Sequence, residues 1–446
     1  MKDNTKRLGE DSIAKLLWSF SAPAIVGMVV NAIYNIVDRI FVGQAVGDKA
    51  LAALSFAFPF MTAIMAVAML AGLGGTSLVA ISLGEGNREK AERILSNVCF
   101  FSGISEVFVS ILGYIFLKPL LRLFGTPDGL IMDYACQYMN IVLAGSAFQG
   151  IGFSLNAIIR SDGNPTMAMI SMLAGAITNI VFDWLFTIIF PLGVRGVAIA
   201  TVMGQLATMV WVLFYFTKKS NLRLNFHNFH IDFSLISKIA FIGLSPALMQ
   251  LAMASVSISY NNLLMKYGGD IAVSAFSVYN SAMTIAIMPI FGINQGVQPI
   301  VGYNYGAKKY DRVRTVMNYG VISATVIVVL GSVLVRLFPE QIVRAFNSSS
   351  ELIKLGKQAL VTNSLALPIV GAQIIYSNYF QYINRPKIAV FMGLSRQCLF
   401  LLPTLFIMAN FFGLNGIFYA QPISDLISAS IAATVTIYSL KRLGKE

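Results

Sequence analysis

Long apolar runs, separated by short charged segments, set the pattern of this chain. Residues 50–84, 196–217, 239–265 and 271–307 contain no Asp, Glu, Lys or Arg. Each run is longer than the ~20 apolar residues that cross a bilayer as an α-helix. A porin-like barrel would instead alternate apolar and polar residues in segments of ~10 residues. The pattern therefore predicts an all-α membrane protein that crosses the bilayer many times.

Charged clusters and turn residues divide the chain into twelve predicted transmembrane helices, six in each half. Because six is an even number, both halves must enter the membrane the same way up. The predicted spans are 16–38, 54–82, 95–117, 136–159, 166–189, 196–216, 240–264, 274–302, 316–335, 358–381, 388–410 and 416–438.

The chain also repeats itself once, with an offset close to 221 residues. "GDKALAALS" at 47–55 resembles "GDIAVSAFS" at 269–277, and "GNREKAE" at 86–92 resembles "GAKKYDR" at 306–312. The repeat predicts two six-helix lobes related by a pseudo-two-fold axis along the membrane normal. Such repeats are common in secondary transporters and favour a substrate site between the halves. A single-chain channel could repeat in the same way.

The predicted lobes divide the chain near its middle. The N-terminal lobe is expected to cover 1–220 and the C-terminal lobe 221–446, with a cytoplasmic linker at 217–238. The N-terminus, the even-numbered loops and the C-terminus carry about two-thirds of the 32 Lys and Arg residues. By the positive-inside rule, both termini then lie in the cytoplasm. The expected location is the inner membrane of a bacterial cell.

Composition narrows the class of protein further. A net charge of +12 would suggest a nucleic-acid partner in a soluble protein, but only 12% of the residues are charged. Soluble proteins carry about twice that fraction. The basic clusters are therefore interpreted as topology signals, and membrane lipids rather than nucleic acid are the expected surroundings. The chain is predicted to be a monomer.

No motif in the chain indicates an enzyme, a cofactor or a resident metal. Cys99, Cys136 and Cys398 lack metal-ligand spacing and are expected to pack as small hydrophobes. His227 and His230 share one loop without a cysteine or carboxylate beside them, which is a weak metal signal.

Five charged residues fall inside predicted spans, where a charge costs roughly 2.5–3.5 kcal/mol on insertion scales. They are Asp38, Glu106, Asp183, Arg396 and Asp425. Asn35 precedes Asp38 by three residues, and Asn179 precedes Asp183 by four, so each pair lies on one helical face. Taken alone, this spacing shows a polar stripe on each helix.

Four segments resemble the multidrug and toxic compound extrusion (MATE) transporters. "GVQPIVGYNYGAKKYDRV" at 296–313 resembles the end of that family's eighth span. "IYNIVDRIFVG" at 33–43, "RSDGNPTMA" at 160–168 and "GVRGVAIAT" at 193–201 are similar to its first-half hallmarks. The resemblance extends over essentially the whole chain, with the MepA/DinF-like bacterial branch as the most similar. It implies efflux of bulky, often cationic drugs, driven by inward H⁺ or Na⁺.

The resemblance also implies a cation-coupling site in the first lobe, formed by Asp38, Asn156, Asn179, Asp183 and Thr201. A poorly solvated carboxyl group beside a second one is harder to ionise. The pair could thus hold a proton in one conformation and release it in another. Spans 7 and 10 contain no Asp or Glu, which favours H⁺ over Na⁺. Alternatively, Asp38 is an interfacial residue.

Other polar residues within the spans have less specific roles. Arg396 and Asp425 are expected to form a buried pair, either structural or a switch. Glu106 either attracts cationic substrates or faces an unseen polar partner. Pro23 interrupts the first span and is a candidate gating residue. Candidate residues for the substrate cleft in span 8 are Tyr279, Asn280, Asn294, Gln295 and Gln298.

Two alternative functions are compatible with the same pattern. A lipid-linked precursor flippase of related architecture would need a strongly cationic central cavity. One intramembrane arginine against several acids argues against that function. A channel or receptor is the second alternative, and single-channel conductance would distinguish it from a transporter.

Overall fold

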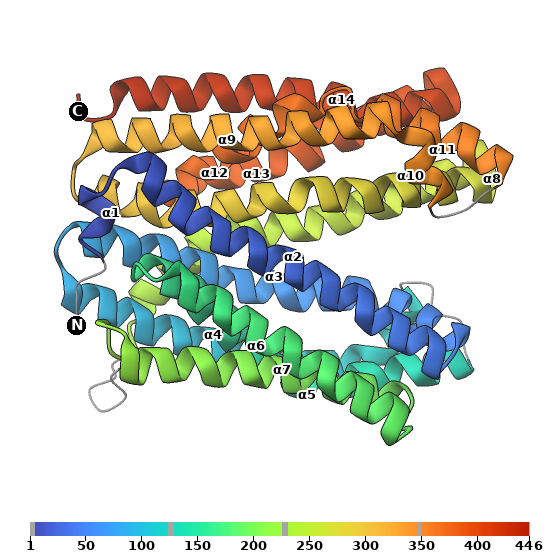
Figure 1. The fold of residues 1–446 in the computed structure, drawn as a ribbon, viewed down its shortest axis with the longest axis horizontal. Coiled ribbons are helices and arrows are strands. Elements are labelled where there is room, and N and C mark those ends of the chain that lie inside the picture. The colour runs from blue at the N-terminus through green and yellow to red at the C-terminus, as the bar shows by residue number, and fades with distance from the viewer. Residues whose placement is uncertain (1–4, 124–128, 225–230, 346–348, 446) are drawn as a thin grey trace.

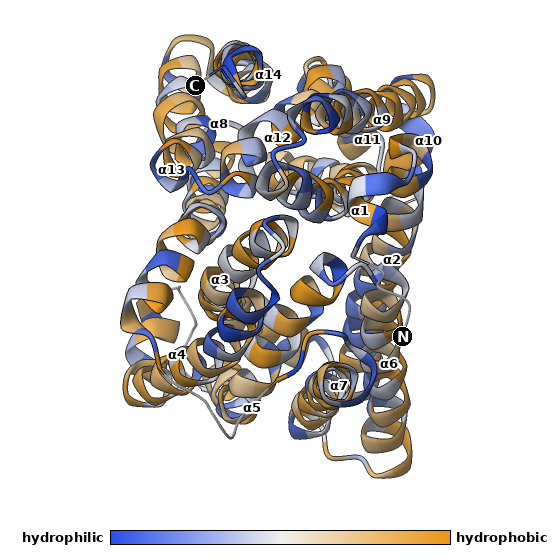
Figure 2. Cartoon of the chain, turned by 90° about the vertical axis from the view of Figure 1, so that its left-hand side faces the viewer, coloured by the Kyte–Doolittle hydropathy of each residue, from blue (hydrophilic) through white to orange (hydrophobic). Residues whose placement is uncertain are grey.

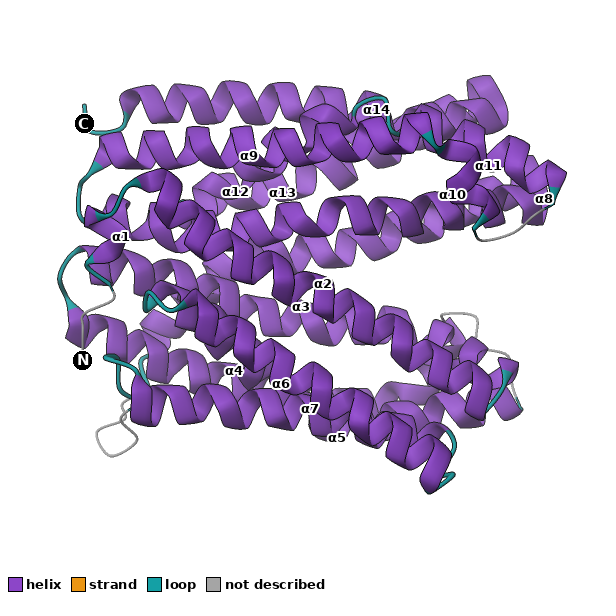
Figure 3. Cartoon of the chain, viewed as in Figure 1, coloured by secondary structure: helices purple, strands orange, loops and turns teal. Residues whose placement is uncertain are grey.

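The computed structural model describes residues 5–123, 129–224, 231–345 and 349–445. His227 and His230 lie outside these ranges. Every regular element in the described chain is a helix, and the helices run roughly parallel to one long axis (Figure 3). The predicted all-α fold is confirmed.

The first half of the chain forms one bundle, shown from blue to green in Figure 1. Its helices begin where polar or turn residues interrupt the apolar pattern. α6, for example, starts at Pro165, whose fixed φ suits the first position of a helix. The elements are α1 (Arg7–Glu10), α2 (Ile13–Ala45), α3 (Asp48–Gly84), α4 (Arg88–Leu123), α5 (Leu130–Ser161), α6 (Pro165–Trp184), η1 (Leu185–Ile189), α7 (Val194–Phe214) and η2 (Tyr215–Lys219).

The second half forms a matching bundle, from yellow to red in Figure 1. Its elements are α8 (Phe233–Gly306), α9 (Tyr310–Leu337), α10 (Pro339–Arg344), α11 (Ser350–Asn363), α12 (Leu367–Tyr382), α13 (Pro386–Leu394), η3 (Ser395–Leu401) and α14 (Leu402–Arg442).

Two continuous helical stretches each contain two membrane crossings. α8 has 74 residues, which would extend about 110 Å against an apolar layer of ~30 Å. It reverses at Gly269, whose backbone has φ 65°, and α14 reverses at Gly413, with φ 57°. The described chain holds nine helices long and apolar enough to cross a membrane, and the α11–α12 pair, bent by 49°, forms a tenth. The two reversals bring the crossings to twelve, as predicted.

Among the described residues, buried apolar side chains form one core in the second bundle and two in the first, one of which also includes Ile239 and Ile242 of α8. The start of α2 belongs to the core of the second bundle, through Leu16, Leu17 and Phe20. Farther along, Gly27 packs against Met172 of α6, in the first bundle. α2 therefore begins on one lobe and continues on the other, and Figure 2 shows it between them.

Glycines let the two lobes approach closely at the end that carries both termini. A Cβ at Gly84 of α3 would overlap the carbonyl of Tyr303, and a Cβ at Gly306 of α8 would overlap that of Ile81. These contacts are reciprocal under an offset of 222 residues, as a pseudo-two-fold axis requires. Gly306 is thus equivalent to Gly84, and the sequence match of Gly86 with Gly306 was two residues out of register.

Candidate cation-coupling site

Asp38 of α2 and Asp183 of α6 come together inside the first lobe. The packing of α2 on α6 places the two carboxyl groups within electrostatic reach of each other. Asp183 has no solvent-exposed surface, and Asp38 is half-buried. No ion pair with Lys or Arg joins either carboxyl group within the described ranges.

Buried polar atoms without partners gather at this pair. Both oxygens of Asp183, both amide atoms of Asn179 and one oxygen of Asp38 lack a hydrogen bond to any described residue. Asn179 is only 3% exposed and lies against Gly204 of α7. Buried polar groups are almost always paired in proteins, so unpaired ones mark a place for water, a proton or an ion. The cluster is therefore a candidate binding site.

Tyr138 of α5 completes the cluster, and the sequence did not single it out. Its hydroxyl lies beside Thr201 of α7, within electrostatic reach of Asp38 and Asp183. Tyr138 is 2% exposed, and Tyr34 of α2 is a further neighbour. A tyrosine within an apolar span has no distinctive spacing. Only the packing of α5 against α7 shows that its hydroxyl lies near the acids.

The local backbone at Asp183 departs from a regular α-helix. The π-helical segment η1 begins two residues after Asp183, and the Thr187 hydroxyl donates to the Asp183 carbonyl over 2.6 Å. Single π-turns are rare and occur frequently at functional sites. The irregular turn lies next to the unpaired carboxyl group.

Asn156, a predicted member of the site, lies elsewhere. Its amide nitrogen donates to the Ala168 carbonyl (2.7 Å) and the Ser171 hydroxyl (2.5 Å), and its oxygen accepts from Arg160 (2.9 Å). Ser171 precedes Asp183 by twelve residues on α6, or about 18 Å along the axis. The structure thus brings together four of the five predicted residues and places Asn156 in a separate cluster with its polar atoms satisfied.

Glu106 of α4 is fully buried within the first lobe rather than at a surface between the lobes. It packs against α5 at Gly150, where a Cβ would come within 3.2 Å of the Glu106 carboxyl carbon. Neither carboxyl oxygen has a partner in the described part of the chain. Its position separates it from the predicted substrate cleft of span 8.

The polar residues predicted in span 8 point in several directions. Gln298 donates to the Ser77 hydroxyl of α3 (3.1 Å), and Gln295 contacts the Met28 sulfur of α2 (3.3 Å), so both face the other lobe. Asn294 instead accepts from Asn378 of α12 (3.2 Å). The other two predicted residues differ in exposure: Tyr279 is buried beside Phe276 and Asn280 is exposed.

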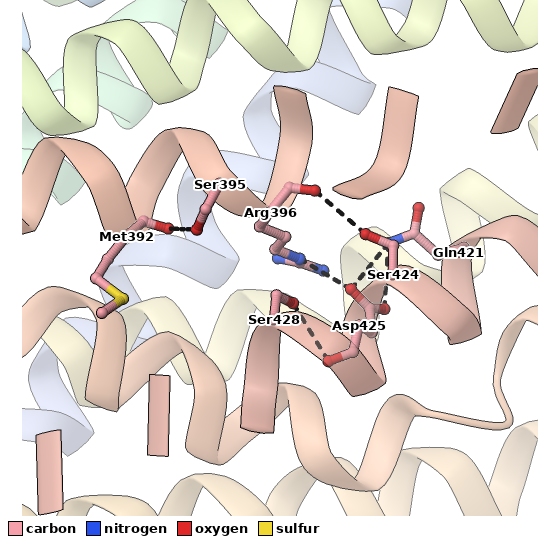
Figure 4. Close-up of polar contacts among 7 residues, drawn as sticks. All are labelled: Met392, Ser395, Arg396, Gln421, Ser424, Asp425 and Ser428. Atoms are coloured by element: carbon pink, nitrogen blue, oxygen red, sulfur yellow. Dashed lines mark hydrogen bonds and ion pairs between the residues drawn. The ribbon is translucent and has the colours of Figure 1, made fainter. Parts of the chain in front are cut away.

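Arg396 of η3 and Asp425 of α14 form an ion pair inside the second lobe (Figure 4). The Arg396 Nε lies 2.9 Å from Asp425 Oδ1, with the two side chains 13% and 5% exposed. Gln421 donates to both carboxylate oxygens, and Ser424 donates to the Arg396 carbonyl (3.2 Å). Asp425 is therefore satisfied, in contrast to the acids of the first lobe.

No group of three or more potential metal-binding His, Cys, Asp or Glu side chains occurs among the described residues. The first-lobe cluster supplies carboxyl, amide and hydroxyl oxygens, which suit H⁺ or a hard cation such as Na⁺.

Comparison with known proteins gives a consistent result. The MatE family model matches the chain twice, at residues 23–185 and 246–407. The chain is 24% identical to Multidrug export protein MepA of Staphylococcus saprophyticus, over 97% of this chain and 95% of that protein. It is 25% identical to MepA of Staphylococcus aureus, over 99% and 97% of the two chains.

Solved structures share the fold over the full length. The MATE multidrug transporter DinF-BH, solved in complex with a dye, is 36% identical, with a TM-score of 0.91 and 99% of both chains covered. An outward-facing MATE family transporter has a TM-score of 0.94 at 24% identity, covering 100% of this chain and 99% of that one. This protein therefore belongs to the MatE family of multidrug efflux transporters, and it is a transporter rather than an enzyme.

Proposed function

We propose that this transporter exports bulky organic cations in exchange for H⁺. The observation that carries the proposal is the Asp38–Asp183 pair: Asp183 is buried, Asp38 is half-buried, and no ion pair joins either one to a basic side chain in the described chain. Two adjacent negative charges are costly in a poorly hydrated interior. At least one carboxyl group must therefore bind a proton or another cation, and that requirement links ion binding to the conformation of the first lobe.

Two features favour H⁺ over Na⁺. Neither the first half of α8 nor α11–α12 in its predicted membrane span contains an acidic residue, so the second lobe offers no carboxylate there for Na⁺. In the first lobe, Asn156 is engaged with Arg160 and Ser171, which removes one oxygen from the predicted ligand set. A pair of carboxyl groups can share one proton without further ligands.

The substrate class rests on the relatives and on charge. DinF-BH, at 36% identity, was solved with a bound dye, and the named relatives are multidrug export proteins. In the proposed cycle, a bulky organic cation in the cleft between the lobes and H⁺ at the first-lobe acids compete for linked states of the two lobes. The protein would act as a monomer in the bacterial inner membrane, with both termini in the cytoplasm.

The glycine contacts between the lobes support alternating access. Gly84, Gly306 and their partner carbonyls close the end that carries both termini, which is the cytoplasmic end in the proposed orientation. The state described here would therefore accept H⁺ from the outside. Release of these contacts would open the cytoplasmic side.

Pro23 lies at the point where α2 passes from the second lobe to the first. Phe20, before it, is in the second-lobe core, and Gly27, after it, packs on α6. A proline within a helix removes one backbone hydrogen bond and favours a bend. We expect Pro23→Ala to slow dye efflux about two- to fivefold, because a stiffer α2 couples the lobes less freely. Unchanged efflux kinetics would exclude a gating role for Pro23.

Imposed ion gradients test the coupling ion. Purified protein in proteoliposomes should move a fluorescent organic cation uphill when a pH gradient is applied, without Na⁺. A Na⁺ gradient at equal pH on both sides should give no uphill movement. Uphill movement driven by the Na⁺ gradient alone would contradict H⁺ coupling while leaving the efflux function intact. Single-channel conductance would contradict both the efflux function and H⁺ coupling.

A further inference from the structure

A basic pocket lies at the end of the second lobe that carries both termini. The turn between α8 and α9 and the end of α14 line an open pocket of about 440 Å³. Five lining residues are basic, and Asp311 is the acidic one. The basic residues are Lys308, Lys309, Arg312, Arg314 and Lys445.

The basic side chains of the pocket differ in their contacts. Arg314 donates to the carbonyls of Leu440 (3.0 Å) and Leu443 and pairs with Asp311, so it holds the end of α14 in place. The side chains of Lys308 and Lys445, in contrast, are exposed and have no hydrogen-bond or ion-pair partner in the described ranges. Arg314 therefore has a structural role in the pocket, and the ammonium groups of Lys308 and Lys445 remain available for a ligand.

The backbone at Lys308 is strained where the first lobe has a glycine. Lys308 has φ 57°, in the left-handed region that disfavours a side chain, and its equivalent under the 222-residue offset is Gly86, with φ 73°. Backbone strain of this kind is concentrated at functional sites. The chain thus keeps a lysine at a position whose geometry favours glycine.

The beginning of α9 also differs from its counterpart. In the first lobe, Asn87 caps α4 by accepting a hydrogen bond from the Lys90 amide (2.9 Å). In the second lobe, the equivalent N-cap residue is Lys309, which provides no side-chain cap. The N-terminus of the 28-residue α9 therefore presents a partial positive charge to the pocket, and such ends bind phosphate groups.

From these features we infer that the pocket binds the phosphate group of an anionic phospholipid. A lipid source fits the position, because α9 and α14 leave the membrane here and the apolar Leu443 lines the pocket. Anionic headgroups attract basic residues at the cytoplasmic surface. The inference uses the proposed orientation of the chain but does not depend on the proposed transport activity.

Binding at this pocket would act on α1. Lys309 donates to the Gly9 carbonyl (3.0 Å), and Arg312 donates to the carbonyls of Asp11 (2.7 Å) and Leu8 (3.3 Å). α1 leads directly into α2, which passes between the lobes. A headgroup that orders Lys309 and Arg312 would therefore hold α1 on the second lobe and favour the closed cytoplasmic end.

Lipid retention provides the direct test. Native mass spectrometry would follow phosphatidylglycerol and phosphatidylcholine bound to the full-length protein from detergent. We expect the wild type to retain phosphatidylglycerol selectively, and Lys308→Gly with Lys445→Gln to retain about fivefold less of it. Lys308→Gly also relieves the backbone strain, so the variant should keep its fold, which its melting temperature checks.

A matched double variant controls for charge. Lys15→Gln with Lys238→Gln removes two exposed lysines of other segments and should retain phosphatidylglycerol like the wild type. The inference would be overturned if the pocket variant retained as much phosphatidylglycerol as the wild type. It would also be overturned if the control variant lost as much of the lipid as the pocket variant. Inorganic phosphate at millimolar concentration forms a second arm: if it binds and phosphatidylglycerol does not, the lipid assignment is wrong.

Discussion

Asp183→Asn is expected to lower uphill efflux of a cationic dye about tenfold or more, with the pH gradient as the driving force. The amide keeps the size of the side chain but cannot release a proton or carry a negative charge. The remaining acid, Asp38, would then lose the second carboxyl group with which it can share a proton. The measurement is dye movement in proteoliposomes with an imposed pH gradient.

This experiment separates a loss of proton coupling from a loss of folding. Asn179 and Thr201 remain in place in the variant, and an asparagine fits a buried, uncharged site, so the melting temperature should not fall. Asp48→Asn, which removes an exposed acid at the start of α3, is the control and should transport like the wild type. Retained uphill efflux by Asp183→Asn would remove Asp183 from the mechanism.

Asp425→Ala is expected to destabilise the protein by about 3–5 kcal/mol, because it leaves the buried Arg396 charge without its partner. The same change deprives Gln421 of the two oxygens to which it donates. The measurement is the free energy of unfolding in detergent, or the melting temperature where unfolding is irreversible. The expected loss is large because both side chains are mostly buried.

Replacing both charges should restore much of this stability. Arg396→Gln with Asp425→Asn leaves no uncompensated buried charge, and such a charge is the main cost of losing one partner of a buried pair. As a control, Glu340→Gln breaks an exposed pair with Arg344 and should cost less than about 1 kcal/mol. If the double variant is stable but transports poorly, the pair has a role in the cycle beyond structure. If Asp425→Ala is as stable as the wild type, the pair is not a structural element.

Much of the fold followed from local pattern. The apolar runs determined the twelve crossings, because a helix that spans the bilayer needs ~20 apolar residues regardless of its neighbours. The internal repeat indicated two lobes, and intramembrane charges such as Asp183 and Asp425 stood out because they are costly there. The MATE resemblance supplied the grouping of Asp38 with Asp183, which the spacing alone did not.

Contacts between helices depended on how each helix is rotated about its axis and shifted along its neighbours, which the sequence of a single helix does not encode. The tertiary structure placed Asn156 with Arg160 and brought Tyr138 to the acids. It also set the offset of the repeat at 222 residues, because Gly84 contacts Tyr303 and Gly306 contacts Ile81, two contacts that this offset interchanges.

The sequence by itself thus determined a two-lobe membrane protein with acidic residues inside its spans, since hydrophobicity and charge act along the chain. The MATE resemblance added the expected transport function. Only packing decided which of the protein's polar groups share one site. Packing also decided that Arg312 holds α1, from the first half of the chain, on the second lobe. The physical reason is that side chains far apart in sequence meet across helices, where the fit of whole surfaces selects their partners.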